Sequence, residues 1–392
     1  MSTFLAPSIF NDVLGPVMRG PSSSHSAASV RIARLARDLA GGDVKKALIE
    51  FDPNGSLATT HESQGSDIGL YAGLLGWEAD DPRIANVEDA LKQSGIETRI
   101  QVRDIGATHP NTYRLTVWGR LPEQKHTLEA DSLGGGMIIV NAIDDHPVRL
   151  QGDYRVTLLK GVDDSNCTAI KRSSVGFSNT QTAGDWLVVE AQDFLDAAEV
   201  EQLDATEVRY LDRVLPVPSF SGMRLPFDRA QDLAGLGKEK LERTVLSSFA
   251  LEYESARSGW SHDEVTGMMS DIRDVMRSSI NAGLRGTDWH DRILGNQSRG
   301  FRNAWQSGQL LDCGMLNRMI LYVTALMEAK SAMEVIVAAP TAGSCGTFPA
   351  TCLAAADSLK LSDDVLLPAM LSGGLIGIFV ANQSSFAAEV GG

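Results

Sequence analysis

A proline-rich stretch divides the sequence into two parts with different secondary-structure patterns. Residues 215–228, LPVPSFSGMRLPFD, contain Pro216, Pro218 and Pro226, and prolines this dense interrupt helices and sheets. Strand-like runs such as KALIEFD and YRLTVWGR precede the stretch, whereas long helical patterns rich in Ala, Leu, Met and Glu follow it. We therefore expect an α+β multidomain protein.

Three domains are predicted from these patterns. Residues 1–150 form an N-terminal α/β domain, in which one helical stripe stops at Gly41-Gly42 and DSLGGGMIIV is a glycine turn entering a buried strand. Residues 151–222 form a small ACT-like α/β unit, with strands at YRVTLLKG and DWLVVEA and a helix at DFLDAAEVEQL. Residues 227–392 form a C-terminal, mostly α-helical catalytic domain, which includes MLNRMILYVTALMEAKSAMEVIVAA as one helical pattern.

Composition favours a small-molecule substrate. Fifty acidic residues against 35 basic ones give a net charge of −15, which disfavours nucleic acid and anionic membranes as partners. The first residues, MSTFLAPSIFNDVLG, lack the pattern of a secretory signal, so we expect a cytoplasmic protein. The apolar run at 365–381 is interpreted as a buried core helix, with a break at Pro368 and the Gly373-Gly374 pair.

The four cysteines, Cys167, Cys313, Cys345 and Cys352, are too scattered for a disulfide scaffold and are expected to be free thiols or ligands. Cys345 lies in APTAGSCGTFPATCLAAA, where an irregular turn enters a small-residue helix. The unpaired N–H groups and the dipole of a helix start lower the pKa of a thiol, so Cys345 is a candidate ligand or nucleophile. The alternative is inert packing, which is the interpretation for Cys352.

Three consecutive serines mark a second helix entrance. The sequence MRGPSSSHSAA at 18–28 places Ser22, Ser23 and Ser24 after a Gly-Pro break. Their hydroxyls and the free N–H groups of a helix start can bind a carboxylate or a phosphate. The alternative is that one serine is an ordinary N-cap and the others fill a loop.

Five motifs taken together identify a resemblance: GPSSSH at 20–25, HPN at 109–111, SLGGG at 132–136, APTAGSCGTFPA at 339–350, and GLIGI with AEVGG at 374–392. They resemble the iron-sulfur-dependent bacterial L-serine dehydratases, which are L-serine ammonia-lyases. The first three resemble the β part of that family and the last two its α part, fused here in one chain. The resemblance implies elimination of water from L-serine to give pyruvate and ammonia, at a 4Fe-4S cluster held by three cysteines, without pyridoxal phosphate.

The resemblance also implies roles for individual residues. Cys345 would be a cluster ligand. His25 would be a catalytic residue that acts with the serine run to orient the substrate carboxylate or hydroxyl. The residues implied in substrate binding are Ser22, Ser23, Ser24, His109, Asn111, Gly134 and Gly135. A structural alternative stands beside His109 and the glycines, because a histidine before proline caps turns and a triple glycine permits positive φ.

The sequence departs from the family pattern in two places. A GHGTD-like stretch supplies a histidine suited to proton transfer in the family, but residues 63–67 read SQGSD, so Gln64 stands at that position. Glutamine cannot act as a base, and His61, three residues earlier, takes the catalytic role only if the loop differs. The second departure is that the sequence ends at EVGG, where the family motif continues into further cysteines, so the ligand set is incomplete and the chain is interpreted as truncated.

Three functions therefore remain open. The first is an L-serine ammonia-lyase, acting as a homodimer or a larger oligomer on a free amino acid. A second is a lyase for L-cysteine or another β-substituted amino acid, because the same elimination would expel sulfide. A third is a clusterless amino-acid-binding regulatory relative, which uses the serine run to bind a carboxylate.

Overall fold

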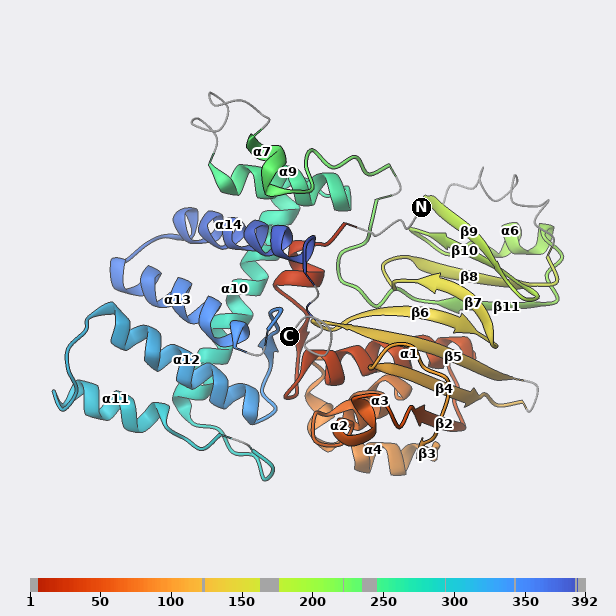
Figure 1. Cartoon of the computed structure of the whole chain (residues 1–392), viewed down its shortest axis with the longest axis horizontal. Coiled ribbons are helices and arrows are strands. Elements are labelled where there is room, and N and C mark those ends of the chain that lie inside the picture. The colour runs from red at the N-terminus through yellow and green to blue at the C-terminus, as the bar shows by residue number, and fades with distance from the viewer. Residues whose placement is uncertain are drawn as a thin grey trace. The chain divides into compact units, whose positions relative to one another are not determined.

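The computed structural model describes residues 6–121, 124–162, 176–220, 222–234, 245–292, 294–341, 343–384 and 386. The chain forms two compact units: a sheet unit of residues 24–222 and a helical unit of residues 1–23 with 223–391. The expected α+β class is confirmed (Figure 1). The first 23 residues thus belong with the helices, and the ACT-like assignment of 151–222 stays a prediction.

The sheet unit contains a six-stranded sheet with the order β3-β2-β4-β5-β6-β7. Its strands are β2 (Lys46–Phe51), β3 (Glu97–Val102), β4 (Thr112–Trp118), β5 (Lys125–Gly134), β6 (Met137–Ile143) and β7 (His146–Leu150). β2 pairs with β3 in parallel and the other neighbours are antiparallel. The predicted strands at KALIEFD and YRLTVWGR are confirmed as β2 and β4, whose buried side chains belong to one core.

Short helices lie beside this sheet (Figure 1). They are α1 (Ala28–Leu39), α2 (Leu57–Thr60), α3 (Ser66–Leu74), the 3-10 turn η3 (Pro82–Asn86) and α4 (Val87–Ser94). α1 and α3 pack closely because Gly69 has no side chain: a Cβ there would lie 2.0 Å from the Ser29 hydroxyl and 2.3 Å from the Ser26 carbonyl oxygen. This glycine therefore lets α3 approach the chain that enters α1.

A second sheet of the same unit has the order β11-β8-β10-β9, with antiparallel neighbours throughout. Its elements are β8 (Arg155–Lys160), β9 (Phe177–Ala183), β10 (Trp186–Ala191), α6 (Ala197–Gln202) and β11 (Glu207–Leu211). The predicted strands and the acidic helix are confirmed. Asp144, in the turn between β6 and β7, accepts hydrogen bonds from His126 Nδ1 and Trp186 Nε1, both at 3.0 Å, and so joins the two sheets.

A buried carboxyl group makes the stability of this sheet depend on pH. Burial, aided by the charge of Asp153, raises the pKa of Glu190 to about 7, although the amides of Asn179 and Gln181 lower it. A raised folded-state pKa adds stability below the usual value of 4.5, and this contribution falls as the pH rises towards 7. We expect Glu190→Gln to remove this dependence of stability on pH. Above about pH 8 its free energy of unfolding should be higher than that of the wild type by roughly 2–3 kcal/mol. Urea unfolding at low and high pH checks this, and an equal difference at both would contradict it.

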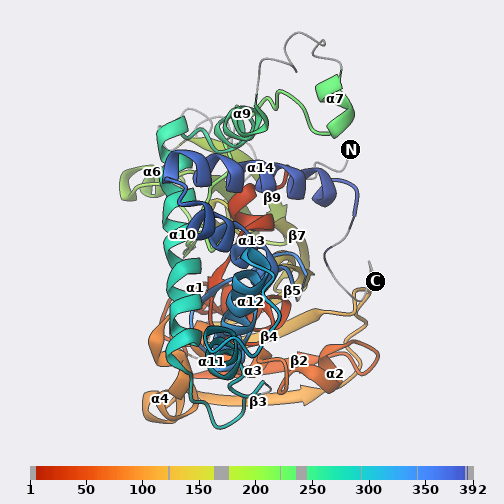
Figure 2. The same cartoon turned by 90° about the vertical axis from the view of Figure 1, so that its left-hand side faces the viewer.

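The helical unit consists mainly of long helices (Figures 1 and 2). Its elements are the π-turn η1 (Ile9–Val13), β1 (Val17–Met18), α7 (Ala230–Ala234), α9 (Leu246–Ser258), α10 (His262–Arg285), α11 (Ser298–Gln306), α12 (Met315–Ser331), β12 (Ile336–Val337), α13 (Ser344–Leu359) and α14 (Asp363–Ala381). The pattern predicted as one helix over 315–339 is wrong at its end. α12 ends at Ser331, Met333 adopts a positive φ of 58°, and β12 pairs with β1 instead.

The N-terminal segment is held on α9 by buried polar contacts. Glu254 accepts hydrogen bonds from Ser8 Oγ at 2.5 Å and from Ile9 N at 2.8 Å. Tyr253 and Arg257 donate to the carbonyl oxygens of Pro7 and Ala6, at 2.9 and 2.8 Å. Burial raises the pKa of Glu254 by more than the charge of Arg257 and the two hydrogen bonds lower it. One turn of α9 thus anchors the chain that leads to β1.

α14 is an uninterrupted helix, so the predicted break at Pro368 and Gly373-Gly374 is wrong. Gly374 serves close packing instead, since a Cβ there would lie 2.6 Å from Ile9 Cγ2. The helix is only partly buried: Ile376 is 55% exposed and Val365 50%. In the described part of the chain, α14 is the one helix with the length and apolar composition of a membrane span. Its most apolar 18 residues have a mean hydropathy of 1.9, and 39% of that segment is buried.

Candidate active site

The serine run leads into a π-turn, η2 (Ser23–Ala27), and then into α1. Ala27 occupies the N-cap of α1, so none of the three serines caps that helix. Ser22, Ser23 and Ser24 are half-buried, and the carbonyl oxygen of Ser24 accepts a 2.8 Å hydrogen bond from Ser132 Oγ. The structure thus brings two of the predicted motifs, GPSSSH and SLGGG, into contact.

His25 is fixed by the short helix α2. Its Nε2 lies 3.1 Å from Thr60 Oγ1, and Thr60 Oγ1 donates its one proton to the carbonyl oxygen of Ser56 at 2.7 Å. Thr60 must therefore accept from His25, which places a proton on Nε2 of that imidazole. With 6% of its surface exposed, His25 is a buried hydrogen-bond donor.

His61, at the end of α2, pairs with Asp67 at the start of α3. Nδ1 of His61 lies 2.8 and 3.0 Å from the two carboxylate oxygens, and its ring packs on Phe51 with centroids 5.1 Å apart. Burial raises the pKa of Asp67 by more than the hydrogen bond and charge of His61 lower it. The side chain of His61 remains 22% exposed, so this pair is accessible while the ring is held.

The HPN motif reaches the same helix through its asparagine. Asn111 is 1% exposed, and its Oδ1 accepts a hydrogen bond from the hydroxyl of Ser56. The backbone N–H of Asn111 donates to Nδ1 of His109 at 3.1 Å. His109 therefore caps its own turn, as the structural alternative expected, and its role in substrate binding stays a prediction.

The triple glycine forms the turn between β5 and β6. Gly134, Gly135 and Gly136 have φ values of 92°, 62° and 87°, a region that L side chains rarely adopt. The carbonyl oxygen of Gly136 accepts a hydrogen bond from the buried Arg31 of α1. These glycines shape the turn beside Ser132, and their contact with substrate stays a prediction.

α2 and the residues that flank it therefore connect the predicted site residues of the sheet unit. Ser56 binds Asn111, Thr60 binds His25, and His61 binds Asp67. Sequence reasoning missed Ser56, Thr60 and Asp67 as site residues. Asp67 carried a signal, as the last residue of SQGSD, whereas the other two carry none.

Cys345 lies in the helical unit at the first turn of α13, as predicted, and is 3% exposed. The expected lowering of its pKa is wrong. Burial raises the pKa by more than the Lys330 ammonium and the backbone N–H groups lower it, because an apolar surrounding disfavours the thiolate. Cys352 is half-buried, with a pKa raised by burial to about 11, and Cys313 is exposed. Cys167 lies outside the described residues.

The serine run and Cys345 both follow strands of one two-stranded ladder. Val17 pairs with Val337 and Met18 with Ile336, antiparallel. The chain continues from β1 to the serines and from β12 to the cysteine. Because the strands are antiparallel, these two continuations leave the ladder at opposite ends.

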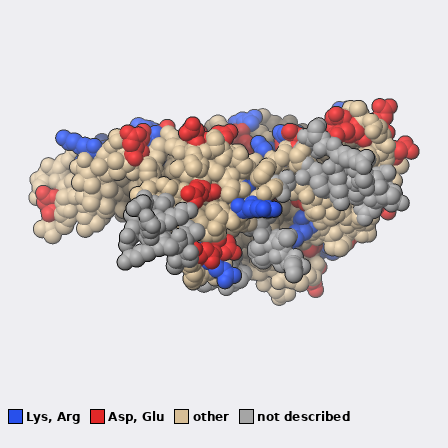
Figure 3. Space-filling model, turned by 90° about the horizontal axis from the view of Figure 1, so that it is seen from above, with Lys and Arg blue, Asp and Glu red and all other residues tan. Residues whose placement is uncertain are grey.

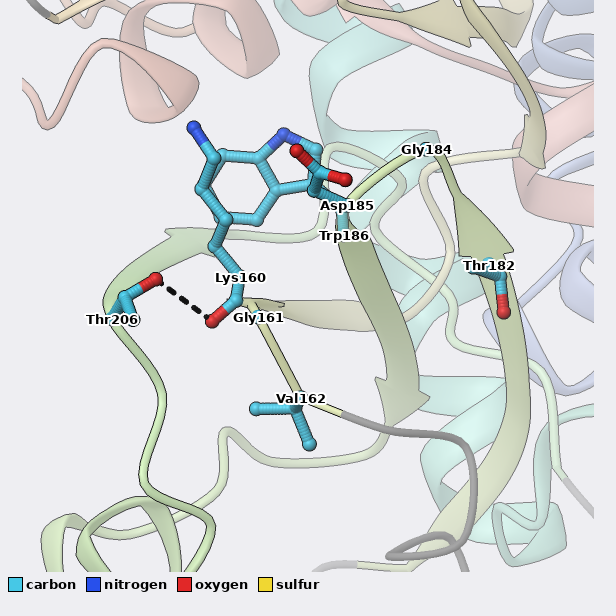
Figure 4. Close-up of a pocket in the computed structure, with 8 residues that line it drawn as sticks. All are labelled: Lys160, Gly161, Val162, Thr182, Gly184, Asp185, Trp186 and Thr206. Carbon is cyan, nitrogen blue, oxygen red and sulfur yellow. Dashed lines mark hydrogen bonds between the residues drawn. The ribbon is translucent and has the colours of Figure 1, made fainter.

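A surface hollow of about 430 Å³ lies on the second sheet, away from these motifs in sequence (Figure 4). Lys160 lies over the ring of Trp186, 5.2 Å from its centroid, but also pairs with Glu207 at 3.3 Å. Its charge is thus already compensated, and no predicted site residue lines the hollow. Figure 3 shows acidic and basic side chains interspersed on one face, without a gathering of Lys and Arg among its described residues.

The described residues contain no group of three or more His, Cys, Asp or Glu side chains arranged to hold a metal ion. Within this part of the chain, Cys345 is the one predicted cluster ligand that the structure places, and its role in holding a cluster stays a prediction. The EVGG end, at which the sequence departs from the family motif, lies outside the described residues.

Comparisons with known proteins cover both units. The sequence model described as Serine dehydratase beta chain matches residues 12–107, and that described as Serine dehydratase alpha chain matches residues 162–392. The probable L-serine dehydratase beta chain of Bacillus subtilis is 36% identical over 150 residues, which are 38% of this chain and 66% of the relative. The probable alpha chain of the same organism is 25% identical over 166 residues, 42% of this chain and 55% of the relative.

A single-chain relative is matched along almost the whole length. The L-serine dehydratase of Streptomyces coelicolor is 27% identical over 391 residues, which are 95% of this chain and 72% of the relative. The chain spans less than two thirds of the length of the separate Bacillus subtilis chains, at 66% and 55%.

Proposed function

Because the chain belongs to the serine dehydratase family, with the alpha-chain match at residues 162–392, we propose that it is a lyase that converts L-serine to pyruvate and ammonia. The observation that carries the proposal is the convergence of His25, His61 and Asn111 on α2 and the residues beside it. That arrangement brings two imidazoles and one amide group to a single short helix and its flanking residues.

The reaction requires two bonds to break at neighbouring carbons. A base takes the α-proton, the electron pair forms the Cα–Cβ double bond, and the β-hydroxyl leaves as water after gaining a proton. The aminoacrylate product becomes an imine and is hydrolysed to pyruvate and ammonia. The serine run and Asn111 would bind the carboxylate, and an imidazole would take the α-proton.

The resemblance implies a 4Fe-4S cluster, but the described residues do not fit one by themselves. Cys345 is buried, its pKa is raised, and no ligand group of three surrounds it in the described part of the chain. A cubane cluster bound by cysteines needs more than one thiolate. We therefore assign no step of the reaction to the cluster.

The test is pyruvate formation by the full chain after anaerobic incubation with iron and sulfide. We expect turnover of L-serine, with slower turnover of L-cysteine. Faster turnover of L-cysteine would reassign the substrate, and binding of L-serine without pyruvate would contradict the lyase. Substituting Cys345 with serine, with iron and sulfide counted, reports separately on the cluster.

A second candidate is a regulatory amino-acid-binding relative. Two observations favour it: Gln64 stands where a histidine is expected, and the described residues supply one buried thiol in place of a ligand set. In that case Cys345→Ser leaves the affinity for L-serine unchanged.

A further inference from the structure

We propose that His61 is the base that removes the α-proton in this chain and that Asp67 is its positioning residue, replacing a base at position 64. The proposal rests on the proposed function, because it assigns a step of that elimination. It departs from the family pattern, because Gln64 occupies the position at which the family pattern has a histidine.

The contact between His61 and Asp67 determines which nitrogen is basic. Both carboxylate oxygens lie within 3.0 Å of Nδ1. An ionised carboxylate only accepts, so Nδ1 carries the proton and Nε2 keeps its lone pair. Among the residues that the structure describes, Nε2 of His61 has no hydrogen-bond partner. A held ring with an open, partly exposed nitrogen is the arrangement that general-base catalysis needs.

The backbone fixes the same pair from a second direction. The carbonyl oxygen of His61 accepts a hydrogen bond from Ser66 N at 2.8 Å, at the beginning of α3. The chain turns between the two residues at Gly65, whose φ is 83°, a conformation that favours glycine. Asp67 lies in the first turn of α3, where the helix dipole stabilises its negative charge. His61 and Asp67 are thus joined through both main chain and side chain.

The other candidates lack these properties. Nε2 of His25 donates to Thr60, and the side chain is almost fully buried. The amide of Gln64 has no basic nitrogen, and its backbone carbonyl oxygen accepts from Ser26 Oγ at 3.2 Å. Position 64 therefore serves as a backbone contact to the turn after the serine run, while His61 keeps the accessible imidazole.

The experiment compares Asp67→Asn and Asp67→Glu with Glu62→Gln, which removes a nearby exposed carboxylate that has no hydrogen bond to His61. The first readout is the pH profile of kcat/KM for L-serine. In Asp67→Asn the acid limb moves to lower pH, because an imidazolium without a neighbouring carboxylate releases its proton more readily. Activity falls about tenfold or more, and Asp67→Glu restores part of it. Glu62→Gln, whose charge acts on Asp67 only through space, keeps the activity and moves the acid limb less than Asp67→Asn does.

The second readout does not depend on turnover. Deuterium exchange at the imidazole C2–H, followed by mass spectrometry, gives a pH midpoint for each histidine. We expect Asp67→Asn to move the midpoint of His61 and to leave that of His109 in place. An unmoved His61 midpoint, or an unmoved acid limb in an active protein, would overturn the proposal. If the wild type makes no pyruvate but the His61 midpoint moves, the proposed function fails, and the base assignment with it, while the positioning contact stands.

Discussion

Replacing His61 with glutamine is expected to lower kcat for L-serine about 10³-fold, because a positioned general base contributes on the order of 10²–10⁴. Glutamine fills similar space, and its amide N–H can still donate a hydrogen bond to Asp67. It cannot take a proton, however. KM should change by less than about threefold, since binding the carboxylate is assigned to other residues. Steady-state kinetics by pyruvate release measure both constants.

The matched control for this substitution is His262→Gln, which removes an exposed histidine at the start of α10. It should leave kcat and KM as they are. A loss below about tenfold in His61→Gln, with KM unchanged, would mean that another group removes the α-proton. His25 would then be the remaining predicted catalytic residue.

The second large effect is expected at Glu254, where substitution with alanine should lower the free energy of unfolding by about 3–5 kcal/mol, the usual cost of breaking a buried charged network. The change leaves the Ser8 hydroxyl and the N–H of Ile9 buried without their acceptor. It also removes a carboxyl group that lies close to Arg257, which is 2% exposed. Denaturant unfolding of the full chain, followed by far-ultraviolet circular dichroism, measures the loss.

Glu252→Ala tests whether this cost comes from the network or from α9 itself. Glu252 lies on the same helix and is half-buried. We expect it to change stability by less than about 1 kcal/mol. If Glu254→Ala costs no more than this control, the buried contacts to residues 6–9 do not anchor the N-terminal segment.

Secondary structure was predictable wherever local pattern determined it. The helix that stops before Gly41-Gly42 and the strand that follows the glycine turn were predicted from apolar spacing and from the glycines themselves. The errors arose where tertiary contacts decide. Residues 336–337 have a helical sequence pattern but form β12, because they pair with β1. Gly374 does not break α14; it allows that helix to pack closely against Ile9.

The candidate site was predictable as a set of segments but not as a set of contacts. Sequence motifs identified His25 and Asn111, whereas the contacts of these residues with Thr60 and Ser56 join positions 35 and 55 residues apart. No local pattern encodes such separations. The pKa of Cys345 could not be inferred either, because the helix start is visible in the sequence while the burial that outweighs it is not.

The ladder between β1 and β12 has a consequence for the connectivity of the chain. Val17 falls within the beta-chain match and Val337 within the alpha-chain match, yet both belong to the helical unit. Severing the backbone after Gly222 would put these strands on different polypeptides, and a pairing that is unimolecular in the fused chain would become bimolecular. In the fused chain, the connection between the two strands thus provides a high effective concentration for their pairing. Two separate fragments would have to reach the same degree of pairing through their bulk concentrations.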